Sequence, residues 1–68
     1  MSPDAWATER KLSNAALGRL LGCSAEMARL HRLGRFVPRP ALVRRWLEIS
    51  DGRVRPEDFY VAADRGEA

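Results

Sequence analysis

The sequence predicts an all-α fold: a compact bundle of four to five short helices with a short C-terminal extension. Ser2, Ser13 and Ser24 each precede a run with helical spacing of apolar residues, and serine is a favoured helix N-cap. Gly22 and Gly34 follow two of these runs, where glycine accommodates the left-handed backbone that ends many helices. We expect residues 1–61 to form one small domain and the small, polar residues 62–68 to be a flexible tail.

The first predicted helix has Pro3 at its first position, carries Trp6 inward and ends near Lys11 or Leu12. The second covers residues 14–21, and the third runs from the Ser24 cap to about residue 33. A fourth helix begins at Pro40 and closes at residues 50–52, and Pro56 begins one further helical turn. The apolar positions of the fourth helix lie on one face: Leu42, Val43, Trp46, Leu47 and Ile49.

The charge is unevenly distributed along the chain. The net charge is +3, but residues 10–55 hold eleven basic and three acidic residues, which gives +8. Residues 1–9 sum to −2 and residues 56–68 to −3, and eleven of the twelve basic residues are arginine. Arginine suits bidentate contacts with phosphate or guanine, so this basic segment favours an anionic polymer as partner. The alternative is a solvated arginine surface without a nucleic-acid partner.

Several classes of function lack support in the sequence. With Cys23 the only cysteine and His31 the only histidine, we expect neither a disulfide within the chain nor a bound metal. We also expect no cofactor and no enzymatic activity, because catalytic sets and phosphate-binding glycine loops are missing from the sequence. Without a signal peptide or a spanning apolar segment, the expected location is the cytoplasm.

Residues 14–33 have the features of a helix-turn-helix motif. Gly18 is the small residue needed where the second helix crosses the first, and Gly22 stands at the turn. Ser24 can cap the second helix, and the residues expected to face the shared core are Leu17, Leu21 and Cys23. In such a motif the second helix enters the major groove of DNA.

The segments Asn14-Ala-Ala-Leu-Gly-Arg-Leu-Leu-Gly-Cys-Ser24 and Arg32-Leu-Gly-Arg-Phe-Val-Pro38 resemble the Cro/CI (XRE) helix-turn-helix family. Residues 49–59 are similar to the segment after the last helix of small Cro-like and YdaS-like regulators. The resemblance implies a four- or five-helix fold, a homodimer, and operator binding in phage or bacterial transcription control. The implied activity is sequence-specific binding of double-stranded DNA, with repression by operator occlusion.

The resemblance implies base-facing positions in the third helix at Ala25, Glu26, Arg29 and Leu30. Arg29 has the chemistry to bind guanine O6 and N7, or it forms an ion pair with Glu26 one turn earlier. Glu26 can accept from cytosine N4, or it favours the positive helix N-terminus and orients Arg29. The candidate phosphate contacts are Asn14, Ser24, Arg32, Arg35 and Arg39.

The third helix departs from the family pattern at Ala28, where the family usually has an apolar residue that fills the core, and at His31, where it has an aromatic or aliphatic one. Because Ala28 and His31 fill a core poorly, we expect either a helix rolled relative to the family, or Leu30 contacting a thymine methyl or a partner protein. In the first case the base-facing residues would change.

The C-terminal apolar residues predict a homodimer interface, formed by Val54, Phe59, Tyr60 and Val61. The alternative is that Phe59 folds back over Trp46 and closes the core of a monomer. Two further functions stay open. One is a protein-interaction or antitoxin-like module, docking another transcription or phage protein on the face formed by Met27, Leu30 and Leu33. The other is DNA binding without sequence preference.

Overall fold

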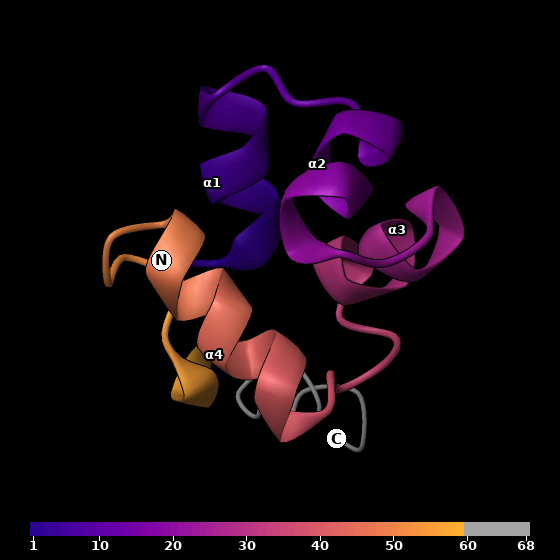
Figure 1. Ribbon diagram of the computed structural model, residues 1–68. Coiled ribbons are helices and arrows are strands. Elements are labelled where there is room, and N and C mark those ends of the chain that lie inside the picture. The colour runs from indigo at the N-terminus through magenta and orange to yellow at the C-terminus, as the bar shows by residue number, and fades with distance from the viewer. Residues whose placement is uncertain (60–68) are drawn as a thin grey trace.

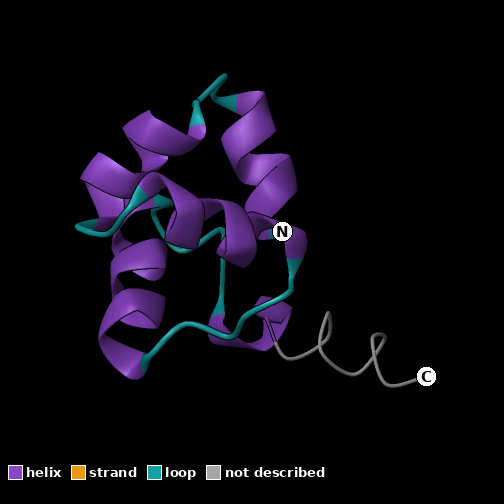
Figure 2. Cartoon of the chain, turned by 90° about the vertical axis from the view of Figure 1, so that its right-hand side faces the viewer, coloured by secondary structure: helices purple, strands orange, loops and turns teal. Residues whose placement is uncertain are grey.

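The computed structural model describes residues 1–59, and these form helices and loops without a strand (Figure 2). The helices are α1 (Pro3–Glu9), α2 (Asn14–Leu21), α3 (Ala25–Leu33) and α4 (Pro40–Ile49), and residues 56–59 are also helical. Figure 1 shows α4 running below α1, α2 and α3. The predicted all-α fold is therefore confirmed. The predicted tail at residues 62–68 lies outside the described residues.

The serine caps form as the sequence predicts. The hydroxyl oxygens of Ser2, Ser13 and Ser24 each accept a hydrogen bond of 3.1 Å from the backbone N–H three residues later. Gly22 and Gly34 adopt φ angles of 78° and 70°, in the left-handed region where α2 and α3 end. The predicted bounds of α2 and α3 are thus correct.

The predicted end of the first helix is wrong, because α1 stops at Glu9. Lys11 adopts a φ angle of +57°, and its N–H donates to the Thr8 carbonyl at 3.0 Å. The Leu12 N–H reaches back to the Ala7 carbonyl at 3.0 Å. These two bonds form a Schellman motif, which ends the helix with a lysine at the position usually held by glycine.

The core is built around two indoles. The rings of Trp6 and Trp46 meet edge to face with centroids 6.0 Å apart, and Phe59 meets Trp46 at 5.9 Å. Aromatic pairs favour this geometry over face-to-face stacking. The other buried apolar residues come from every helix except α4: Ala7, Leu17, Leu21, Ala28 and Val54, the last from the segment after α4. This chain thus encloses both tryptophans without a partner.

The segment after α4 closes this core, which corrects the predicted dimer interface. Val54 is fully buried and Phe59 is 3% exposed, both against the core of the same chain. Phe59 packs against Trp46, so the alternative that the sequence left open, in which Phe59 folds back over Trp46, is the arrangement observed. Tyr60 and Val61, the other two predicted interface residues, lie outside the described residues.

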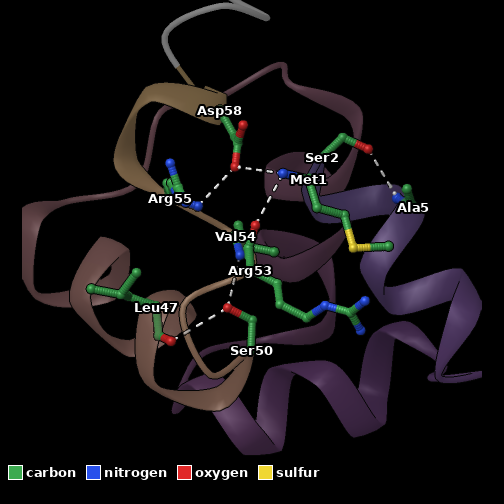
Figure 3. Close-up of polar contacts among 9 residues, drawn as sticks. All are labelled: Met1, Ser2, Ala5, Leu47, Ser50, Arg53, Val54, Arg55 and Asp58. Atoms are coloured by element: carbon green, nitrogen blue, oxygen red, sulfur yellow. Dashed lines mark hydrogen bonds and ion pairs between the residues drawn. The ribbon is translucent and has the colours of Figure 1, made fainter.

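Polar contacts hold this closing segment in place (Figure 3). The Ser50 hydroxyl accepts from the Val54 N–H at 2.9 Å and donates to the Leu47 carbonyl at 3.3 Å. The Met1 amino group donates to the Arg53 carbonyl at 3.0 Å and forms an ion pair with Asp58 at 3.2 Å. These contacts join the start of α1 to the segment that covers the core.

Candidate nucleic-acid interface

α2 and α3 cross closely at Gly18. A Cβ atom at this position would lie 2.7 Å from the Cys23 carbonyl oxygen, closer than packed atoms allow, and 3.0 Å from that of Ser24, which is a tight contact. The Gly18 carbonyl in turn accepts from the N–H groups of Gly22 and Cys23, both at 2.8 Å. The predicted helix-turn-helix is present, and its crossing depends on the missing side chain at Gly18.

The rotation of α3 is fixed by its buried face. Ala28 and His31 are fully buried, so the expectation of a rolled helix is wrong. Ala28 fits because α3 approaches its neighbours closely. His31 fits because its Nδ1 accepts a hydrogen bond of 3.1 Å from the indole N–H of Trp46, and this burial lowers the pKa of His31. The residues opposite this face therefore point to solvent.

The predicted base-facing residues lie on the outer side of α3. Ala25 and Glu26 are exposed, the Arg29 side chain is 43% exposed, and Leu30 is half-buried. Arg29 binds Glu26 through two hydrogen bonds, from Nε to Oε1 at 3.1 Å and from Nη2 to Oε2 at 2.6 Å. These bonds hold the pKa of Glu26 below its usual value. Nη1 and one hydrogen of Nη2 remain as a fork at the end of Arg29.

Arg32 does not occupy the position expected of a phosphate contact. Its side chain is only 17% exposed, and its Nε forms an ion pair with Asp4 at 2.9 Å. Its Nη atoms also donate to the Leu12 carbonyl, the Asn14 amide oxygen and the Thr8 hydroxyl, at 3.1, 3.1 and 3.3 Å. The guanidinium therefore forms these hydrogen bonds within the chain, and they join α1, the start of α2 and α3.

The other candidate phosphate contacts are accessible. Ser24, Arg35 and Arg39 are exposed, and Asn14 is half-buried at the first position of α2. Arg35 and Arg39 lie in the loop after α3, and neither forms an ion pair with another described residue. The structure thus leaves both arginines accessible in the loop that follows α3.

Two surface hollows flank α3. One of about 270 Å³ is lined by Asp4, Asn14, Arg29, Arg32 and Leu33. The other, of about 230 Å³, is lined by Cys23, Ser24, Met27, Phe36, Arg39 and Leu42. At 3.6 residues per turn, Met27 projects from the flank of α3 opposite to Arg29 and Arg32. Of the predicted phosphate contacts, Asn14 thus borders one flank of α3, and Ser24 and Arg39 border the other.

The apolar face named as an alternative is only partly accessible. Leu33 is 51% exposed, whereas Met27 and Leu30 are half-buried. Phe36, in the loop after α3, is 45% exposed. Phe36 lines a hollow with Met27, whereas Leu33 lines the hollow on the opposite flank of α3, so Phe36 extends this face only at Met27.

Residues 1–59 contain no helix with the length and apolar character needed to cross a membrane. The same residues contain no group of three or more histidine, cysteine, aspartate or glutamate side chains placed to hold a metal ion. The chain matches no known family model, no curated protein and no solved structure.

Proposed function

We propose that this chain binds double-stranded DNA in a sequence-dependent manner and regulates transcription, with α3 as the recognition helix. The observation that carries the proposal is the outer face of α3, where Arg29 is braced by Glu26 directly opposite the buried Ala28 and His31. The major groove of B-DNA admits an α-helix presented in this way. Repression by operator occlusion is the corresponding mode of regulation.

The charge distribution supports a DNA partner. Residues 10–55 carry the net charge of +8, and the exposed Arg35 and Arg39 follow α3 directly in the chain. Contacts from such arginines to phosphates would set the orientation of the protein on the duplex without reading its sequence. Base recognition would then depend on α3 alone.

The free end of Arg29 supports guanine as the recognised base. Glu26 occupies Nε and one hydrogen of Nη2, so the end-on fork of the guanidinium stays available. That fork matches guanine O6 and N7, the commonest specific contact of arginine in the major groove. Ala25, one position before Glu26, is small enough to let the backbone of α3 approach the base edges.

A protein partner is the second candidate, favoured by the exposed Phe36, which lines one hollow together with the half-buried Met27. Exposed apolar residues that cluster on one face mark interaction surfaces. A homodimer stays a prediction. Of its four predicted interface residues, Val54 and Phe59 are buried in the core of the same chain, and Tyr60 and Val61 lie outside the described residues.

Two arginine substitutions test the proposed function. Arg29→Ala should weaken binding to the preferred duplex by about 1–3 kcal/mol and remove discrimination at one base pair. Arg35→Ala should weaken binding to preferred and random duplexes alike, because a phosphate contact is independent of sequence. Titration of both variants against both duplexes measures the difference. Equal losses for Arg29→Ala on the two duplexes would show that α3 does not read the base there.

A further inference from the structure

We infer that Arg32 is a positioning residue, which holds the Asn14 amide so that its NH2 group faces a DNA phosphate. The inference rests on the proposed function, and it assigns to Arg32 a role through Asn14 instead of a phosphate contact of its own. Arg32 and Asn14 are 18 residues apart in the chain and meet where α3 passes the start of α2.

The donors of Arg32 are already committed within the chain. Its hydrogen bonds to Asp4, Thr8, Asn14 and the Leu12 carbonyl use all but one of the N–H donors that a guanidinium carries. With its side chain 17% exposed, Arg32 has little surface to offer a phosphate. The contacts to α1 hold the guanidinium from one side, so its position toward Asn14 is fixed.

The chemistry of this contact sets the orientation of the amide. A guanidinium has donors and no acceptor, so only the amide oxygen of Asn14 can face Arg32. Asn14 Oδ1 accepts from Arg32 Nη1 at 3.1 Å, and the NH2 group therefore points the other way. That NH2 group has no hydrogen-bond partner within residues 1–59 and is not among their buried polar atoms.

The outward NH2 group is a donor without an acceptor beside it. A phosphate oxygen is an acceptor and can bind such a donor. Asn14 and Arg29 line the same hollow, so a phosphate at Asn14 would be next to the base-facing side of α3. Fixing the amide in advance also avoids the loss of side-chain entropy on binding. Asn14 would thus set the register of α3 along the duplex.

The most direct test is Asn14→Asp. The carboxylate keeps the shape of the amide and still accepts from Arg32, so we expect the variant to be at least as stable as the wild type. It has lost the donor and gained a negative charge, so affinity should fall at least about tenfold on preferred and random duplexes alike. Wild-type affinity for Asn14→Asp would overturn the inference.

A double-mutant cycle tests whether Arg32 acts through Asn14. Arg32→Gln should lower affinity in the wild type but cause no further loss in Asn14→Ala, because the amide it positions is gone. Additive losses would show that Arg32 contributes independently and would overturn the inference. Arg53→Gln is the matched control, since it removes the same charge and an ion pair to α1 at Glu9, 3.0 Å long.

We expect Arg53→Gln to bind with near wild-type affinity, and a loss equal to that of Arg32→Gln would overturn the inference in favour of a general charge effect. Thermal melting of each variant separates folding from binding. If the wild type binds no duplex, the proposed function itself fails. If the wild type binds and Asn14→Asp binds equally well, only the role assigned to Asn14 and Arg32 fails.

Discussion

His31 joins α3 to α4 through one buried hydrogen bond. Its Nδ1 accepts from Trp46, so the neutral imidazole carries its proton on Nε2, which is buried without a partner among the described residues. A protonated ring would place a second donor against the indole N–H and a charge in an apolar site. The fold therefore requires the neutral form.

The first prediction is that stability falls as the pH drops below about 6.5, the ordinary pKa of histidine. Burial lowers the pKa of His31 in the folded chain, so the unfolded chain binds more protons between the two pKa values. Since His31 is the only histidine, chemical denaturation between pH 7.5 and 5 measures this effect. The loss should be much smaller in His31→Gln, whose amide oxygen can accept from Trp46. A wild-type stability that is constant over this range would contradict the account.

At the residue scale, the sequence predicted a contact between two residues of one helix but missed contacts between residues far apart in the chain. The Glu26 and Arg29 pair was foreseeable because both residues lie on one helix, three positions apart. The position of Arg32 was not, because its partners Asp4 and Thr8 are 28 and 24 residues away in the chain. Helical spacing contains no information about which elements meet at that distance.

At the scale of the elements, the crossing of α2 and α3 depends on Gly18. Gly18→Ala should lower the free energy of unfolding by about 1–3 kcal/mol, because its Cβ would collide with the carbonyls of Cys23 and Ser24. This loss should exceed the gain of about 1 kcal/mol in helix propensity. Displacement of α3 should also weaken DNA binding by the folded protein.

Gly22→Ala is the control for this crossing. Its Cβ would meet nothing within 4 Å, but the φ angle of +78° disfavours a side chain by about 1–2 kcal/mol. We therefore expect a loss of stability with the DNA affinity of the folded protein retained. Denaturation and duplex titration measure both quantities. If Gly18→Ala binds DNA as tightly as Gly22→Ala does, the close crossing is not what positions α3.

The elements that the sequence predicted correctly are those with local stop signals. Serine caps and glycine ends fixed α2 and α3, whereas α1 ended early at a lysine in the left-handed conformation. Nothing in the residue type marks Lys11 as such a position. The predicted roll of α3 was also wrong. The fit of Ala28 and His31 depends on α4 and on how closely α2 and α3 cross.

At the scale of the whole molecule, a few apolar residues after α4 decide whether the chain closes on itself. Val54 and Phe59 complete the core around Trp46. The sequence did not distinguish this cover from an interface, because an apolar residue buries the same surface in either place. The basic segment and the outer face of α3 are left as the surfaces that carry the proposed function.

Selection of duplexes from a random pool, followed by titration over a salt series, tests the central claim most directly. The account predicts an enriched sequence that contains a guanine, and two copies on one site would give half-sites about 10 base pairs apart. If about five phosphates are neutralised, log K should fall against log salt with a slope near −4.5. A pool without enrichment, together with a slope near zero, would contradict DNA recognition by this chain.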